Sequence, residues 1–475
     1  MEVAKKKKID FTEGKIFFKL FYFILPIVAT NLLQAFYNAA DMVIVSLSPV
    51  KDAVGAIGTT SAFINLVVNI FIGFSVGANI VVAREIGAKN KEKTQNAVHT
   101  SLLMALIFGA VAMGIGFAVS RPVLRLMGNT GTLLDLAVDY TFYYFLGAPF
   151  MALTNYLIAI FRAKGDSKTP LIVLSVSGIL NVGLNLFFVL IVGWSVEGVA
   201  VATSLANVFS FLILIVKLSQ DKDDATFSWK RLKLEKNAFK DIVINGIPAG
   251  IQSALFSLSN MLIQSSVVTV NNNLVPPTSD YAPVLKGNTS AGNIETFIYT
   301  AMNAVYQGVI TVTSQNIGAK KPRRVRRILY SSLLMVFAVG SLLSGVVLLF
   351  QKPLLSLYGV VDGAEGSLEA LAMQTARTRF SIIATTYFLC GFMDVCSGVL
   401  RGMGKAIVST VITLIGACFL RVVWIWTVFA ANQTVATVFI SYPISWIITM
   451  SASLIVIRVL LKKMIKEEEK TAEGI

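Results

Sequence analysis

The chain has 475 residues, of which 55% are hydrophobic and 14% charged, and its mean hydropathy is +0.72. This composition excludes a soluble globular protein and is typical of a chain that crosses a membrane many times. The net charge of +15 does not indicate nucleic-acid binding, because the lysines and arginines lie in short clusters between apolar stretches and form no separate basic domain.

Apolar stretches long enough to cross a hydrocarbon core, which takes about 20 helical residues, recur along the whole chain. We therefore predict an all-α polytopic membrane protein, since the alternating pattern of a β-barrel is absent. The first stretch is too long for a cleavable signal peptide, and we expect it to remain as the first helix. The twelve predicted spans are 17–47, 54–83, 97–119, 133–160, 169–193, 197–219, 242–270, 293–317, 328–350, 368–400, 406–430 and 434–461.

The distribution of positive charge predicts the orientation of these spans. Clusters at Lys5–Lys8, 89–93, 230–236 and 320–327 alternate with loops that carry almost no charge. Because lysine and arginine are retained on the cytoplasmic side, this pattern places both termini in the cytoplasm. We expect a multi-pass protein of the plasma membrane.

The sequence contains an internal repeat. REIGAK at 84–89 corresponds to QNIGAK at 315–320, and RPVLRLMG at 121–128 corresponds to KPLLSLYG at 352–359, with the same offset of 231 residues in both pairs. A constant offset without a gap indicates that the chain consists of two homologous halves.

Six spans in each half place both halves in the membrane in the same orientation, so we predict two parallel bundles around a central cleft. Rocking of one bundle against the other would open that cleft to each side in turn, as in a secondary transporter. We expect an external loop at 271–293, whose Asn-Thr-Ser sequon at 288–290 matters only in a secretory pathway. The predicted segments are an N-terminal bundle at 1–219, a cytoplasmic linker lying on the lipid headgroups at 220–241, a C-terminal bundle at 242–461 and a cytoplasmic tail at 462–475.

One polar stripe stands out in the first span. Asn31, Gln34, Asn38 and Asp41 are spaced i, i+3, i+7 and i+10, which places them on one face of a helix. A carboxylate inside hydrocarbon costs about 2.5–3.5 kcal/mol on insertion scales, so this face should meet the bundle interior or a water-filled cavity. Pro26, one to two turns earlier, is expected to kink the helix.

Further polar faces in the first half predict a polar chamber. The fifth span has Ser177, Asn181 and Asn185 at i, i+4 and i+8, and the sixth has Thr203 and Asn207 at i, i+4. For each amide or hydroxyl, the alternative is an interhelical hydrogen bond worth roughly 0.6 kcal/mol and no other role.

The second half differs in its polar residues. Asp394 and Arg421 fall inside predicted spans, either as a buried pair that fixes the bundle or as part of a site. Arg377 and Arg379 lie near outer helix ends, where charge costs little, and His99 is expected to be an interfacial residue. The cysteines are expected to be packing residues rather than disulfide or metal partners: Cys390, Cys396 and Cys418.

Several longer segments together form a specific pattern. They are LPIVATNLLQAFYNAADMVIV at 25–45, GANIVVAREIGAKN at 77–90, FRAKGDSKTP at 161–170, NVGLNLFFV at 181–189, AVYQGVITVTSQNIGAK at 304–320, SGVLRGMGK at 397–405 and SYPISW at 441–446. Through these segments the chain resembles the multidrug and toxic compound extrusion (MATE) family over nearly its whole length. The resemblance implies a cation-coupled antiporter, in which H⁺ or Na⁺ runs inward while an amphipathic organic compound, often cationic, is expelled.

In bacterial and archaeal members, the N-terminal half holds a proton or sodium site, and the matching positions are Asp41, Asn181, Asn185 and Thr203. Asn185 departs from the pattern, because many relatives carry a second aspartate there. A single carboxylate among amides still binds a proton when burial raises its pKa, whereas a sodium site loses one formal charge. The resemblance therefore favours H⁺, with Na⁺ at Asp41 as the alternative.

The family also implies how coupling would work. Protonation of Asp41 would release its hydrogen bonds and let the first helix bend at Pro26, which would narrow a chamber lined by Gln34, Tyr37 and Asn38. In some relatives an acidic cation site lies in the second half, where Asp394 is the candidate.

Other functions fit the sequence less well. A flippase for lipid-linked sugars, the main alternative, needs a cationic chamber for a pyrophosphate. An enzyme needs a constellation of catalytic residues at depth, which the single histidine and scattered cysteines do not provide. A channel is less suited to a two-fold repeat with unmatched polar halves. We expect small organic substrates and membrane lipid as partners, no nucleic acid, no cofactor beyond the coupling ion, and a monomer.

Overall fold

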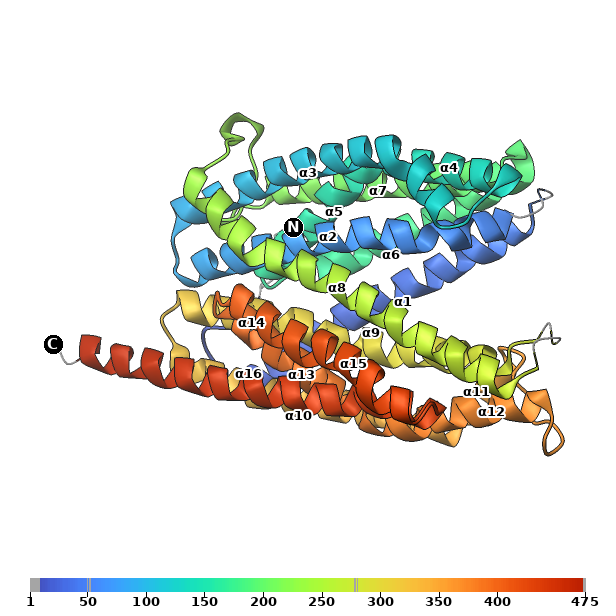
Figure 1. Cartoon of the computed structure of the whole chain (residues 1–475). Helices are drawn as coiled ribbons and strands as arrows, with labels where there is room; N and C mark the ends of the chain where they lie inside the picture. Colours follow the sequence, from blue (N-terminus) through green and yellow to red (C-terminus); the bar gives the residue numbers. More distant parts are fainter. Residues whose placement is uncertain (1–8, 49, 51–52, 277–278, 280, 473–475) are drawn as a thin grey trace. The chain divides into compact units, whose positions relative to one another are not determined.

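The computed structural model describes residues 9–48, 50, 53–276, 279 and 281–472, and these contain helices and connecting loops but no strand (Figure 1). The predicted cluster Lys5–Lys8 lies outside the described residues. The chain forms two compact units. The first consists of Met1–Ser253 with Ser314–Lys321, and the second of Ala254–Thr313 with Pro322–Ile475.

The first unit holds the helices of the first sequence half. The predicted span 133–160 is two helices bent by 50° at Gly147, where a proline at 149 begins the second helix. The helices are α1 (Ile16–Ser46), α2 (Ala53–Gly87), α3 (Lys91–Leu126), α4 (Gly131–Leu146), α5 (Ala148–Ala163), α6 (Lys168–Leu186) with its π-helical continuation η1 (Phe187–Val192), and α7 (Val196–Gln220).

The second unit holds most of the second half. Two of its predicted spans contain wider π-helical turns, which interrupt otherwise continuous helices. After the short turn η2 (Trp229–Arg231), the helices are α8 (Lys236–Leu274), α9 (Pro283–Gly318), α10 (Pro322–Leu349), α11 (Gln351–Ser356), α12 (Leu368–Arg379), η3 (Phe380–Ala384), α13 (Thr385–Gly402), α14 (Ala406–Thr413), η4 (Leu414–Phe419), α15 (Leu420–Trp424), η5 (Ile425–Phe429) and α16 (Val435–Ala472).

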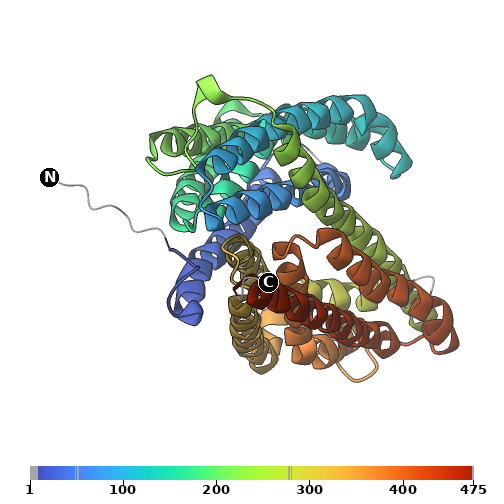
Figure 2. The same ribbon diagram turned by 90° about the vertical axis from the view of Figure 1, so that its left-hand side faces the viewer.

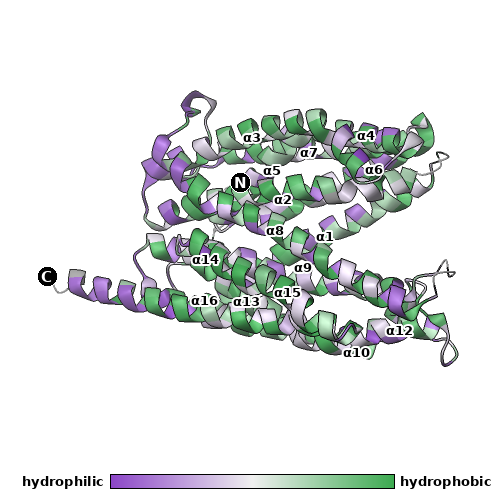
Figure 3. Cartoon of the chain, viewed as in Figure 1, coloured by the Kyte–Doolittle hydropathy of each residue, from purple (hydrophilic) through white to green (hydrophobic). Residues whose placement is uncertain are grey.

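The membrane-spanning character of the helices is confirmed. Among the described residues, ten helices are long and apolar enough to cross a membrane, and eleven if the bent pair α4–α5 counts as one span. The remaining predicted span, 293–317, corresponds to α9, which is as long as the others but too polar to be recognised by hydropathy alone. Figure 3 shows apolar residues along the helices and hydrophilic residues at helix ends, in the linker and in the last turns of α16.

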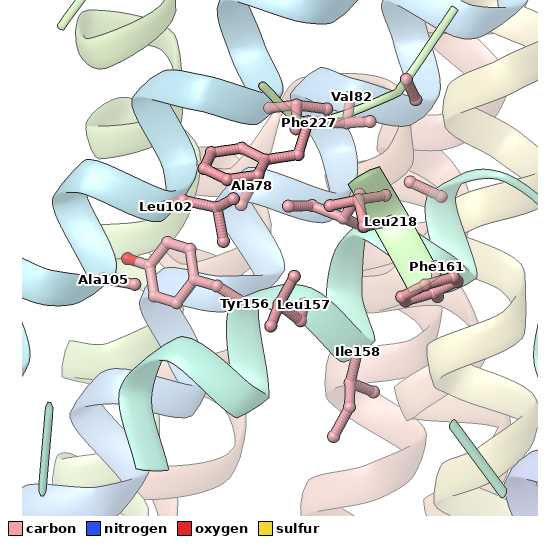
Figure 4. Packing of buried hydrophobic residues seen from close by; sticks show 14 of the residues in the cluster. Ala78, Val82, Leu102, Ala105, Tyr156, Leu157, Ile158, Phe161, Leu218 and Phe227 are labelled. Carbon is pink, nitrogen blue, oxygen red and sulfur yellow. The ribbon is translucent and has the colours of Figure 1, made fainter. Parts of the chain in front are cut away.

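A buried apolar cluster fixes the linker to the first unit. The Phe227 ring of the linker is 4% exposed and packs with residues of α2, α3, α5 and α7, including Leu102 and Leu218 (Figure 4). Burying a phenylalanine contributes about 1.5–3 kcal/mol, so this contact favours a docked linker. The central part of the linker is therefore docked on the first unit, and its position on the lipid headgroups stays a prediction.

Polar contacts hold the same linker. The His99 ring stacks on Phe227 with centroids 5.3 Å apart, and its Nε2 lies 3.1 Å from the backbone nitrogen of Ser228, so this histidine is buried inside the protein. Its position at the membrane interface stays a prediction. The buried Lys164 ammonium pairs with Asp221 and, at 3.0 Å, with Asp223. The linker is part of the first unit because both its apolar and its charged side chains are satisfied there.

Helix α8 crosses the boundary between the units. Its first half belongs to the first unit because α2 and α8 approach closely through glycines: a Cβ on Gly73 would overlap the backbone of Gly250, and one on Gly77 would overlap the carbonyl of Ile242. Small residues allow such contact between membrane helices. The compact units therefore differ from the predicted bundles 1–219 and 242–461.

The α8 helix begins with a charged cap outside the apolar stretch. The Glu235 carboxylate accepts hydrogen bonds from the backbone N–H groups of Ala238 (2.6 Å) and Asn237 (3.1 Å), which lower the pKa of Glu235.

The last helix, α16, continues through the predicted boundary at 461 to Ala472, so the described part of the predicted tail is helical (Figure 1 and Figure 2). Arg323 of α10 pairs with Glu468 of this extension at 3.6 Å.

Most of the predicted external loop 271–293 is helical. Helix α8 continues to Leu274 and α9 begins at Pro283. Asn288 of the sequon is only 3% exposed, and its amide donates to Gln264 Oε1 (3.0 Å). An N-glycan needs an exposed asparagine in an accessible loop, so the fold leaves this sequon unusable.

We expect no glycan at Asn288 when the chain is inserted into microsomal membranes. The measurement is the gel mobility of the product before and after glycosidase treatment. A mobility shift that disappears in Asn288→Gln would contradict the helical, buried placement of this residue.

Candidate functional site

Asp41 of α1 faces two asparagines of α6 inside the first unit. Its Oδ1 accepts a hydrogen bond from Asn185 Nδ2 at 2.5 Å. The Asn181 amide satisfies both its ends when its nitrogen also faces Asp41, donating to Oδ1 at 2.9 Å while its oxygen accepts from the backbone N–H of Thr203 at 3.3 Å. The four residues that the sequence selected as an ion site are thus brought together.

The periodicity of α6 produces this arrangement. Asn181 and Asn185 are one turn apart and are 6% and 0% exposed, whereas Asp41 is partly buried. One turn earlier on the same face, Ser177 accepts a hydrogen bond from Ser210 of α7 (2.7 Å). The hydroxyl of Thr203 donates to the Val199 carbonyl of its own helix at 3.0 Å. Thr203 therefore donates to the site from its backbone N–H and not from its hydroxyl.

One oxygen of the cluster lacks a hydrogen-bond partner. Asn185 Oδ1 is fully buried, and no described residue donates to it. A buried acceptor without a donor costs about 1–3 kcal/mol. Carboxylate and amide oxygens are acceptors for a proton-bearing group or ligands for a hard cation, so the arrangement has capacity for H⁺ or Na⁺.

The rest of the α1 stripe is divided between two environments. Gln34 and Asn38 are exposed, and Asn31 is partly buried. Tyr37 does not project freely: its ring lies against Gly178, where a Cβ would overlap it, and its hydroxyl donates to the Ser175 carbonyl at 3.2 Å. Tyr37 therefore attaches α1 to α6.

Pro26 lies inside α1, which continues through it from Ile16 to Ser46. Proline provides no backbone N–H, and the Thr30 hydroxyl donates to the Pro26 carbonyl at 2.8 Å. A Thr bonded to the carbonyl four residues earlier favours bending of a helix. Both features make α1 easier to bend at a position about four turns before Asp41.

The second unit does not pair Asp394 with Arg421. Arg421 is buried, donates from Nε to Ser445 Oγ at 2.9 Å and lies over the Tyr442 ring at 4.2 Å. Asp394 Oδ2 is buried without a hydrogen-bond partner in the described part of the chain. The interpretation of these two charges as an ion pair is therefore wrong, and each has its own surroundings within α13 and α15.

A buried ion pair in the second unit was not foreseen. Arg379 donates to Glu295 Oε2 from Nε (3.0 Å) and Nη2 (2.7 Å) and to Asn288 Oδ1 (2.6 Å), with side chains only 15% and 2% exposed for the pair. Arg379 is thus not an exposed charge at a helix end. The sequence contained one signal, since Glu295 lies inside the predicted span 293–317 and a carboxylate there needs a partner.

The sequence and the fold of this chain are similar to those of known proteins. The MatE family model matches residues 26–187 and 248–427. The chain is 28% identical over 403 residues to the probable multidrug resistance protein YoeA of Bacillus subtilis, covering 82% of each, and 24% identical over 318 residues to an FAD transporter of Shewanella oneidensis, covering 65% of this chain and 67% of the relative. A solved outward-facing multidrug resistance MATE family transporter matches with a TM-score of 0.87 and 20% identity, over 97% of this chain and 99% of the other.

Breaking the Glu295–Arg379 pair should destabilise the second unit. We expect Arg379→Ala to lower the free energy of unfolding by about 3–5 kcal/mol, because it leaves the Glu295 carboxylate buried and unpaired. The double variant Glu295→Leu with Arg379→Met should lose much less, since no charge remains unpaired. Thermal unfolding in detergent measures both, and equal losses would contradict a role for the pair in stability.

Proposed function

Because this chain belongs to the MatE family, and is therefore a multi-pass membrane transporter and not an enzyme, we propose that it is a secondary antiporter exporting amphipathic organic compounds in exchange for H⁺ or Na⁺. The observation that carries the proposal is Asp41, a carboxylate of a membrane helix whose only hydrogen-bond donors among the described residues are amides of α6. Among the described residues, no basic side chain pairs with Asp41 to neutralise its charge permanently.

The charge of Asp41 determines how firmly α1 is held to α6. Hydrogen bonds to a charged group contribute about 1.5–3 kcal/mol each, and those between neutral groups about 0.5–1.5 kcal/mol. Protonation therefore weakens the contacts from Asn181 and Asn185 without breaking the helix. Bending of α1 near Pro26 and Thr30 would then become easier, which changes the position of the exposed Gln34 and Asn38.

The oxygen ligands available around Asp41 favour H⁺ over Na⁺. Sodium would rely on one carboxylate and on neutral amide oxygens such as Asn185 Oδ1, so its binding would lack a second negative charge. A proton needs only the carboxylate. The proposal is therefore H⁺ coupling, with Na⁺ as the alternative that the same experiment tests.

The same cluster favours a cationic substrate. With its single carboxylate and exposed amides, α1 offers acceptors to an organic cation, and release follows when the proton removes the charge. The Bacillus relative is named for multidrug resistance and the Shewanella relative for FAD, so an anionic dinucleotide is the competing substrate class. We further propose a plasma-membrane monomer with both termini in the cytoplasm.

Asp41→Asn should abolish coupled export. In inverted vesicles, wild type should accumulate a fluorescent organic cation when a pH gradient is imposed, and the variant should match vesicles without the protein. The reason is that the amide resembles the carboxyl group in shape but cannot exchange a proton.

Asn31→Ala is the matched control on the same helix, because it removes a partly buried stripe residue outside the predicted chamber while keeping Asp41. If Asp41→Asn exports as fast as wild type, Asp41 is not the coupling group. If wild type moves an anionic flavin nucleotide and no cation, the proposed substrate class is wrong.

Asn185→Asp should shift the coupling toward Na⁺. A second carboxylate beside Asp41 adds one negative charge to the site, so the Na⁺ concentration for half-maximal export should fall by about fivefold or more. Asn155→Asp is the control, since the Asn155 amide donates only to Met151 of its own helix (2.9 Å). An unchanged Na⁺ dependence in Asn185→Asp would separate this residue from the ion site.

A further inference from the structure

The repeated motif of the two halves forms two identical helix ends. At the end of α2, Ala88 N–H donates to the Arg84 carbonyl (2.9 Å), and at the end of α9, Ala319 N–H donates to the Gln315 carbonyl (2.9 Å). The next residues, Lys89 and Lys320, have φ of 56° and 54° and are the only residues other than glycine with positive φ in the described part of the chain. Sequence positions 231 apart therefore have the same backbone conformation.

These two ends also lie against each other. A Cβ on Gly87 would overlap the carbonyl of Gln315, and a Cβ on Gly318 would overlap the carbonyl of Arg84. The contact is reciprocal, because Gly87 corresponds to Gly318 and Arg84 corresponds to Gln315 in the repeat. We call this set of four residues the glycine contact. Such self-complementary packing is what a two-fold relation between equivalent motifs produces.

Side chains of α9 hold its end in the first unit. Gln315, which is 3% exposed, donates to the Ala163 carbonyl at 2.7 Å, and the buried Asn316 donates to the Phe11 carbonyl at 3.2 Å. Lys321 donates to the Thr12 carbonyl at 3.0 Å. These bonds explain why Ser314–Lys321 belongs to the first unit although the sequence places it in the second repeat. All three acceptors are backbone carbonyls, which water satisfies equally well when the segment leaves.

The two lysines place backbone strain directly after the two helix ends that form the glycine contact. A left-handed conformation is unfavourable for a residue with a Cβ, and glycine would adopt it without cost. Strained residues of this kind cluster at functional sites, switch regions among them. Both copies of the motif keep lysine at the strained position, so the strain is present on both sides of the glycine contact.

We propose that the glycine contact is reversible and closes the linker-bearing end of the protein, and that it must open once in each transport cycle. The cycle itself rests on the proposed antiport function, because alternate exposure of a site requires each end to open in turn. The contact is closed in this structure. Its partner surface is not another protein but the equivalent motif of the same chain.

Accessibility of Ser314 tests the contact without any substrate. Ser314 is 0% exposed and lies one turn before Gly318. Ser314→Cys is introduced after Cys390, Cys396 and Cys418 are changed to alanine, and labelling by a membrane-impermeant maleimide is measured in inverted vesicles. We expect slow labelling in this background.

Gly87→Leu and Gly318→Leu should each raise the labelling rate by about tenfold or more, because the added side chain prevents the docked arrangement. Gly58→Leu in α2 and Gly345→Leu in α10 are matched controls, since a Cβ at either position meets no atom within 4 Å. Gly87→Ala and Gly318→Ala replace the leucine variants if those fail to fold. Lys89→Gly and Lys320→Gly should lower the labelling rate, because they relieve the strain of the closed form.

Unchanged labelling in both Gly87 and Gly318 variants would overturn the proposal, as would equal increases in the controls. Faster labelling combined with export at the wild-type rate would also overturn it, because closure would then have no part in the cycle. A failure of the proposed antiport function can be distinguished from a failure of this proposal. Wild type would then export no fluorescent cation under a pH gradient or a Na⁺ gradient, while the labelling rates would still report whether the contact opens.

Discussion

A charged group in a membrane helix is costly unless it has a partner inside the protein, and most of the buried charges described above follow this constraint. Asp41 meets it with two amides, Glu295 with the guanidinium of Arg379, and Arg421 with a hydroxyl and an aromatic ring. The three solutions differ in permanence. The guanidinium fixes the charge of Glu295, whereas the amides of α6 stabilise the charge of Asp41 without preventing its loss. The same cost of burial therefore produces a structural pair in the second unit and a group able to exchange a proton in the first.

The two halves preserve backbone geometry while their side chains diverge. Arg84 and Gln315 hold equivalent positions at the ends of α2 and α9, yet Arg84 pairs with Asp241 of α8 and Gln315 bonds to the Ala163 carbonyl. Close approach of two backbones tolerates only glycine, so Gly87 and Gly318 are constrained in the same way. Side chains beyond the contact are not under that constraint. This explains how equivalent positions of a duplicated sequence acquire different polar contacts.

Much of the fold could be predicted because hydropathy is a local property. The first residues of α1, α7 and α14 lie within one residue of the predicted starts of the corresponding spans. The Asp41 cluster followed from helical spacing combined with the family resemblance. Tertiary partners could not be predicted in this way. The burial of Phe227 in the first unit, the helical state of Asn288 and the pairing of Arg379 all depend on residues far away in sequence. At these positions the polar sequence predicted a loop or a surface, whereas the fold places the side chains in packed surroundings with partners.

The energies at Asp41 limit how the protein would couple ion to substrate. Changing two hydrogen bonds from charge-assisted to neutral removes about 2–3 kcal/mol in total. Moving a two-state equilibrium from 1:99 to 99:1 takes about 5.5 kcal/mol. Protonation alone therefore cannot drive a strongly biased equilibrium, and the two conformations must already be close in free energy. The left-handed Lys89 and Lys320 act in that direction, because each makes the helix end that it follows, that of α2 or of α9, less stable by about 1–2 kcal/mol than glycine would. Under the proposed coupling, a modest carboxylate switch is sufficient because strain at the closed contact keeps the two conformations close in free energy.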